Sequence, residues 1–204
     1  MNARHQRATA MAPADRRQAI VRAVTPLLIE KGSSVTTREM AEAAGIAEGT
    51  IFRVFPDKFT LIHEVIKTSM DPIPVQKALS EIYPSAPIEV QLAEAARIIL
   101  ERFQNIVALM SILRTTPTSV RTQLSGPPPF VSRSNTAVLA ALTGLFERHR
   151  ERLRIEPSRA AAAFRALIFA SGHPVLTPEE QLTIDEMVGI LLSGITHPVL
   201  EMAT

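Results

Sequence analysis

The sequence contains no cysteine in its 204 residues. This absence excludes disulfide bonds, thiolate metal ligands and cysteine nucleophiles, and it is compatible with a reducing compartment. Long hydrophobic runs are missing too, because no stretch approaches the roughly 20 apolar residues that a membrane-spanning helix needs. The basic stretch at residues 1–17 lacks the continuous apolar segment of a signal peptide. We therefore expect a cytoplasmic protein with no membrane segment.

The patterns of common catalytic and metal sites are also absent. There is no glycine-rich phosphate loop, no GxSxG elbow and no HExxH motif. The histidines are scattered, and none has a second ligand at metal spacing. We expect no enzyme activity, no cofactor and no bound metal. An all-helical enzyme that uses a cavity between its helices is the weaker alternative.

Basic residues are concentrated in the first third of the chain. Residues 1–67 carry ten Lys or Arg and seven Asp or Glu, a balance of +3, and the remainder carries twelve and thirteen, a balance of −1. A basic N-terminal third followed by a nearly neutral remainder is typical of a protein whose N-terminal part contacts nucleic acid. A solvated basic tail without a partner is the plain alternative.

The hydrophobic pattern predicts an all-α fold of about nine helices and no strand. Apolar residues at helical spacing fill residues 14–31, and a long amphipathic helix begins near Pro87. The prolines around Asp71 predict a helix end, and GPPPF at residues 126–130 predicts a loop, with another break near 115–117. The remaining helices are expected at residues 132–154, 157–172 and 177–195.

Residues 36–55 combine the features that a helix-turn-helix requires. Ala41 is a small residue where the two helices cross, and Gly45 follows four positions later in the turn. Thr36 or Thr37 can cap the first helix. The residues expected to lock the two helices together are Met40, Ala44, Ile46, Ile51 and Val54. Two helices that merely pack against each other would show a similar pattern.

A longer run carries a resemblance that favours the helix-turn-helix. The run TTREMAEAAGIAEGTIFRVFPDKFTLI resembles the DNA-binding domain of TetR-family transcriptional regulators almost position by position. The preceding RRQAIVRAVTPLLIEKG is similar to that family's first helix, so the resemblance covers residues 16–65. It implies a DNA-binding domain at residues 1–55, extending to about 72 with a connecting helix at 56–70, and a ligand-binding and dimerisation domain at 56–204.

The resemblance also implies partners. They are a near-palindromic double-stranded operator, a second copy bound through the last two helices, and a small effector that releases the DNA, as in a repressor. The residues that we expect at the DNA are Thr36, Thr37, Arg38, Ala47, Glu48, Gly49, Thr50, Phe52, Arg53 and Lys58. Glu48 fits the positive end of the helix dipole better than a contact with cytosine, although both roles are open.

Three positions depart from the family pattern. Ala47 replaces a common serine, Phe52 a tyrosine that contacts phosphate, and Val54 a histidine or tyrosine. The lost tyrosine hydroxyl removes a hydrogen bond worth about 1 kcal/mol. The departures leave open a second function, that of a TetR-like protein that no longer binds DNA and instead senses a ligand or binds a partner.

The expected effector is apolar. The chain has no tryptophan and a single tyrosine, so its C-terminal part offers few polar aromatic groups. Apolar side chains on the faces of helices can line a pocket or simply fill the core. The residues nominated for the pocket are Phe103, Met110, Leu142, Phe146 and Phe164.

Overall fold

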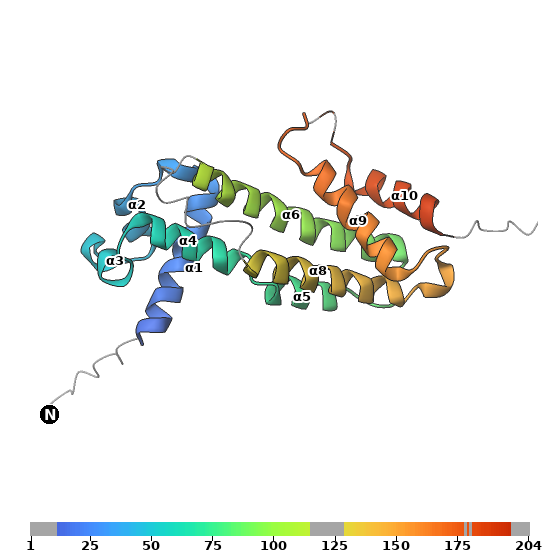
Figure 1. The fold of residues 1–204 in the computed structure, drawn as a ribbon, viewed down its shortest axis with the longest axis horizontal. Helices are drawn as coiled ribbons and strands as arrows, with labels where there is room; N and C mark the ends of the chain where they lie inside the picture. The colour runs from blue at the N-terminus through green and yellow to red at the C-terminus, as the bar shows by residue number, and fades with distance from the viewer. Residues whose placement is uncertain (1–11, 115–128, 178, 180, 197–204) are drawn as a thin grey trace, which may run out of the picture. The chain divides into compact units, whose positions relative to one another are not determined.

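The computed structural model of the chain describes residues 12–114, 129–177, 179 and 181–196. These residues form α-helices and no strand, and a single β-bridge joins Leu153 to Thr196. The all-α prediction is confirmed. The helices, drawn in Figure 1, are α1 (Pro13–Lys31), α2 (Thr37–Ala43), α3 (Glu48–Val54), α4 (Lys58–Ser69), α5 (Ile73–Ser80), α6 (Ile88–Arg114), α8 (Pro129–Glu147), α9 (Pro157–Ser171) and α10 (Ile184–Ile195). None of these helices combines the length and hydrophobicity needed to span a bilayer.

The chain divides into two compact units. The first consists of α1 to α4 and the C-terminal end of α6 from Ala108. The second consists of α5, the rest of α6, and α8 to α10. Helix α6 therefore supplies residues to both hydrophobic cores: Leu92 and Ile99 are buried in the second, and Leu109 and Ile112 in the first.

The core of the first unit is built on α1, as the apolar spacing predicts. Ile20, Val21, Val24 and Leu28 are all buried, and they pack with residues of α2, α3 and α4. The helix continues through the exposed Pro26 and ends at Gly32, whose φ of 61° lies in the left-handed region that glycine adopts at low cost.

Helix α5 was not predicted, because the prolines near Asp71 were interpreted as a helix end. Pro72 instead occupies the N-cap of α5, and Pro74 lies in its first turn. In the first turn the backbone N–H groups have no partner within the helix, so a proline there loses nothing. The Asp71 carboxylate accepts the N–H of Ile73 at 3.1 Å.

The bounds of α8 also correct the prediction. The helix begins at Pro129, so Phe130 is helical and not part of a loop. Residues 126–128 and the predicted break at 115–117 lie outside the described residues. At its other end α8 stops at Glu147 and not near Arg154, because the polar run after Phe146 offers no apolar side chain to hold further turns against the core.

The last helix starts later than predicted. Helix α10 begins at Ile184, where Thr183 and Glu186 form a capping box: the Glu186 N–H donates to the Thr183 hydroxyl at 3.2 Å and the Glu186 carboxylate accepts the Thr183 N–H at 2.8 Å. The capping box gives hydrogen-bond partners to the N–H groups of both Thr183 and Glu186. Thr177, which the sequence analysis expects at the start of this helix, does not begin α10.

The core of the second unit forms where α8 and α9 pack against α6 and α10. Leu142, Phe146 and Phe164 are fully buried in it. The rings of Phe146 and Phe164 meet edge to face, with centroids 5.9 Å apart. Helix α6 begins at Ile88, as predicted, and its regularly spaced apolar residues pack into the same core.

Candidate DNA-binding interface

Helices α2 and α3 and the turn between them have the geometry of a helix-turn-helix. Gly45 in the turn has a φ of 64°, a conformation that side chains with a Cβ rarely adopt. The next residue, Ile46, donates its N–H to the carbonyl of Ala41 at 3.0 Å and closes the turn. Of the predicted contacts, Met40, Ala41 and Ile51 are buried, and Ala44, Ile46 and Val54 are partly buried against them.

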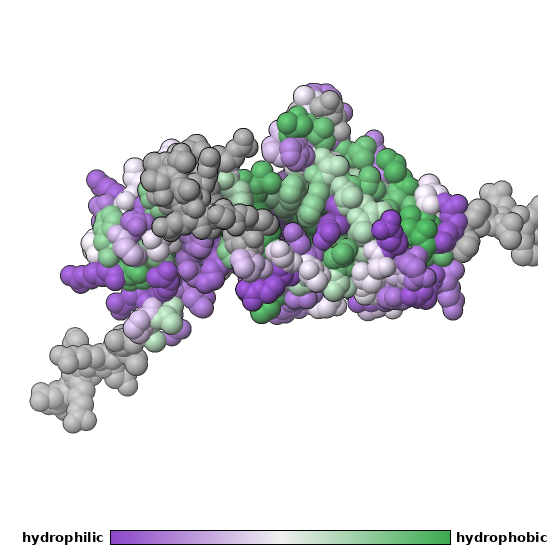
Figure 2. Space-filling view, viewed as in Figure 1, coloured by the Kyte–Doolittle hydropathy of each residue, from purple (hydrophilic) through white to green (hydrophobic). Residues whose placement is uncertain are grey.

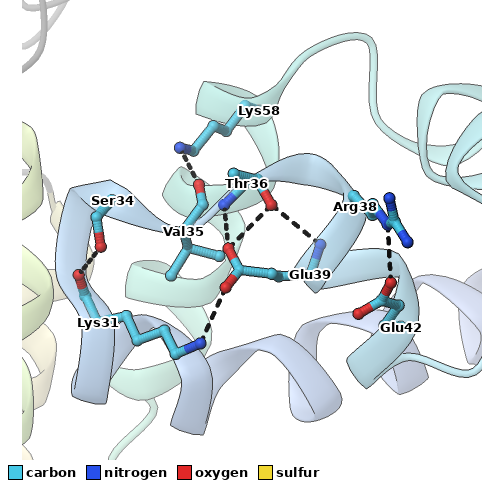
Figure 3. Close-up of polar contacts among 8 residues, drawn as sticks. All are labelled: Lys31, Ser34, Val35, Thr36, Arg38, Glu39, Glu42 and Lys58. Carbon is cyan, nitrogen blue, oxygen red and sulfur yellow. Dashed lines mark hydrogen bonds and ion pairs between the residues drawn. The ribbon is translucent and has the colours of Figure 1, made fainter.

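A capping box fixes the start of α2 (Figure 3). The Glu39 carboxylate accepts the N–H of Thr36 at 2.8 Å, while the Glu39 N–H donates to the Thr36 hydroxyl at 3.2 Å. Lys31, in the last turn of α1, donates to the same carboxylate at 2.9 Å. These contacts, of which the Thr36 N–H is the strongest, lower the pKa of Glu39 from 4.5 to about 2.

Lys58 holds the chain between α1 and α2. Its ammonium group donates to the carbonyl of Ser33 at 3.1 Å and also to that of Val35, as Figure 3 shows for Val35. Thr36 is likewise engaged by its capping box. A phosphate contact from Lys58 or the Thr36 hydroxyl, as expected from the sequence, would compete with these internal bonds. Both side chains position α2 in this structure.

Helix α3 presents a different set of side chains outward. Glu48, Gly49 and Arg53 are exposed, Thr50 is partly exposed, and the ring of Phe52 is 48% exposed. Ala47 occupies the N-cap and makes no side-chain hydrogen bond there, as the sequence predicts. The exposed face of α3 therefore carries a cation, an acid, a hydroxyl and an aromatic ring on a short helix.

Arg17 anchors the C-terminal end of α3, a role that the sequence analysis missed. Its Nη1 donates to the carbonyl of Val54 at 3.1 Å, and its Nη2 lies 3.4 Å from the Glu64 carboxylate on α4. Its guanidinium also covers the ring of Phe55, with Cζ 4.2 Å from the centroid. A signal was present: Arg17 lies one turn before the buried Ile20 and Val21, on the apolar stripe of α1.

An open cavity of about 520 Å³ lies between the start of α1 and α3. Guanidinium groups bind phosphate oxygens through paired, charge-assisted hydrogen bonds. The arrangement is therefore suited to an anionic ligand with several oxygens. The lining residues are Pro13, Ala14, Arg16, Arg17, Thr50, Arg53 and Val54.

Comparison with known proteins gives this geometry a family. Residues 20–65, which contain α2 and α3, match the model of the bacterial regulatory proteins of the tetR family. The match indicates that residues 20–65 carry a DNA-binding domain of the tetR type. It agrees with the prediction of a DNA-binding regulator, and the solved structures that share the fold are described as transcriptional regulators and not as enzymes.

Solved TetR structures share the fold over most of the chain. A Mesorhizobium loti protein described as a TetR-family regulator superposes with a TM-score of 0.61 at 19% identity, covering 92% of this chain and all of its own. A TetR regulator from Streptomyces coelicolor gives 0.60 at 19% identity, covering 88% and 98%. SmeT, the repressor of a multidrug efflux pump in Stenotrophomonas maltophilia, gives 0.54 at 16% identity, covering 90% and 91%.

The residues nominated for an effector pocket have different surroundings. Leu142, Phe146 and Phe164 are fully buried in the core of the second unit. Met110 belongs to the first unit and is 39% exposed. Phe103 stacks on Phe169, with centroids 4.6 Å apart.

In the described part of the chain, no cluster of three His, Asp or Glu residues has a geometry that would hold a metal ion.

The bare N-cap of α3 leads to a stability prediction. Ala47 has φ −69° and ψ 144°, the extended conformation in which a serine hydroxyl can accept an N–H of the first turn. We expect Ala47→Ser to raise the free energy of unfolding by about 0.5–1 kcal/mol. The control Ala140→Ser, at an exposed position within α8, should instead lower it by up to about 0.5 kcal/mol. Urea denaturation of both variants measures the difference, and equal effects would contradict the capping argument.

The lowered pKa of Glu39 leads to a prediction about the stability of the protein at low pH. Its ionised carboxylate stabilises the folded state fully above pH 4.5, and this contribution is lost as the pH falls toward its folded pKa of about 2. The difference in unfolding free energy between wild type and Glu39→Gln should therefore shrink over that interval. Thr36→Val should retain most of the pH dependence, because it keeps the backbone N–H that contributes most. Denaturation curves at several pH values test this, and a constant difference would contradict it.

Proposed function

We propose that the chain is a repressor that binds a near-palindromic operator as a homodimer and leaves it when a small molecule binds. The observation that carries the proposal is the exposed face of α3 beside the arginine-lined cavity. A helix of this kind can enter the major groove while neighbouring cations hold the phosphates. The first unit would be the DNA-binding domain, and the second the ligand-binding and dimerisation domain.

Different side chains of the first unit would do different work at the DNA. Phe52 and Arg53 are exposed and Thr50 is partly exposed, so all three can reach base edges, with the ring of Phe52 suited to a thymine methyl group. Arg16, exposed at the rim of the cavity, adds a phosphate contact that the sequence analysis did not name. Glu48 stabilises the N-terminus of α3 and disfavours phosphates that come too close.

The dimer would form through α9 and α10. The two helices enclose an open apolar groove of about 510 Å³, and the exposed face over them is largely hydrophobic in Figure 2. Ile190 in this groove is 53% exposed, and several of its neighbours are alanine or glycine, which let a second helix approach closely. A second copy is the occupant that this family favours. The lining residues are Ala163, Ala166, Leu167, Ala170, Ile190, Leu191, Gly194 and Ile195.

The alternative is a TetR-like protein that has lost DNA binding. Phe52 favours it, because this exposed ring replaces the tyrosine whose hydroxyl contacts phosphate in the family. SmeT, by its description a repressor, supports the repressor proposal. The place of action would be the cytoplasm, where the DNA is.

Binding to DNA tests the proposal directly. DNA fragments selected by the wild-type protein from a random library serve as the operator, and fluorescence anisotropy at two salt concentrations measures affinity. We expect Arg53→Ala to weaken binding by about 1–3 kcal/mol, while the wild type itself weakens steeply with salt. Arg159→Ala, an exposed arginine on α9, is the matched control and should bind as the wild type does. Failure to select any sequence would support the alternative.

The oligomeric state tests the groove. Ala166→Arg places a long cation in an apolar interface and should convert the dimer to a monomer, because a buried unpaired charge is costly. Ala140→Arg makes the same change at an exposed position of α8 and should leave the dimer intact. Sedimentation equilibrium measures both. A monomeric wild type, or a dimeric Ala166→Arg, would exclude this groove as the dimer interface.

A further inference from the structure

The second unit holds a positive charge between its helices. Arg102 of α6 is half-buried, and its Nη2 donates to the hydroxyl of Ser134 on α8 at 2.9 Å. Ser134 is only 2% exposed, so this bond draws the guanidinium toward the interior. Desolvation lowers the pKa of Arg102, and the charge of Asp71 partly offsets this effect. An anion beside a half-buried cation gains more from the pairing than it would in water.

A second guanidinium meets α8 at the same level. Arg165 of α9 donates through Nη1 to the carbonyl of Asn135 at 3.0 Å, and Asn135 directly follows Ser134. The Cζ atom of Arg165 lies 5.9 Å from the ring centroid of Phe169. Arginines from two helices therefore converge on two consecutive residues of α8.

Aromatic and aliphatic side chains lie beside these charges. Phe103, next to Arg102 on α6, stacks on Phe169 of α9 with an interplanar angle of 19°. A Cβ at Gly172 would lie 2.6 Å from Leu100 Cδ1 and 3.1 Å from Phe103 Cδ1, so α9 approaches α6 closely at this end. Yet no residue of α6 from Leu100 to Val107 is fully buried, unlike Ile99 just before them. The apolar wall here is only half covered by protein.

The sequence strengthens the electrostatic argument. Between Glu101 and Glu147 the chain contains no Asp or Glu, although acids are about as frequent as bases in the chain as a whole. The basic residues in this stretch are Arg102, Arg114, Arg121 and Arg133. Of these, Arg102 and Arg133 belong to the described part of the second unit, and no acid within this stretch offsets their charge.

We propose that the second unit binds an amphipathic acid, with its anionic group on Arg102 and its apolar body against Phe103 and Phe169. This inference rests on the proposed function and names the chemical class of its effector. It replaces the purely apolar ligand expected from composition. The planar guanidinium fork suits the two oxygens of a carboxylate, and Ser134 holds the fork in place. Arg165 adds positive charge beside the same aromatic pair.

A matched pair of fluorescent probes tests the class of ligand. Anilinonaphthalene sulfonate is an apolar anion, and phenylnaphthylamine is the same aromatic skeleton without the charged group. Titrations use the full-length protein, with decanoate and decanol as competitors. We expect the anion to bind more tightly than the neutral probe. Decanoate should displace it at concentrations where decanol does not.

Substitution of the arginine gives the deciding measurement. We expect Arg102→Gln to weaken binding of the anionic probe at least tenfold and to change binding of the neutral probe less than twofold. Arg102→Lys should recover part of the loss, because it restores the charge without the fork. Arg97→Gln is the matched control, since Arg97 is an exposed residue of the same helix, paired with Glu94. It should leave both probes unchanged.

Each other outcome speaks against the inference. Unchanged binding of the anion by Arg102→Gln, or no binding by the wild type, would overturn it. Equal loss of both probes would show that Arg102 holds the helices together and does not bind the acid. The anisotropy assay with selected DNA runs in parallel. A wild type that binds the acid but no DNA would fail the proposed function and leave this site standing.

Discussion

A helix of seven residues does not keep its shape alone in water, because the cost of forming its first turn is repaid by too few hydrogen bonds. Helix α3 is such a helix, and its N-cap gives it no side-chain support. Everything that the first unit presents to DNA therefore depends on contacts made from outside α3. Ile51 is buried beneath it, and Arg17 binds its last carbonyl while pairing with Glu64. These contacts give Arg17 a structural role in holding α3 in place.

The same division of labour explains Lys58 and Thr36. The sequence analysis expects both at the DNA, yet their polar atoms already bind carbonyls and a carboxylate within the unit. The side chains left exposed at the proposed interface are fewer and lie on α3, at the start of α1 and, with Arg38, on α2. DNA recognition by this chain would thus depend on a few exposed side chains, held in place by a larger number of side chains that bond within the first unit.

Much of this could be predicted from the sequence, and the failures have physical causes. The helix-turn-helix was predictable because Gly45 and the apolar residues around it serve local geometry, which sequence spacing encodes directly. Helix α5 was missed because a proline ends a helix in its interior but suits its first turn, and position alone separates the two cases. Arg17 and Arg102 were missed because their partners are distant in the chain. Periodicity cannot show which side chains meet across helices.

The two capping boxes tie two separate tasks to one chemical condition. Helix α2 begins with Thr36 and Glu39, and α10 begins with Thr183 and Glu186; in both, a carboxylate accepts the N–H of the threonine, and both pKa values are lowered by that bond. A proton on either carboxylate weakens it as the acceptor on which the first turn relies. Helix α2 supports the helix that we propose to read DNA, and α10 forms one wall of the groove that we propose for a second copy. Acidification would therefore weaken both the proposed recognition of DNA and the proposed self-association.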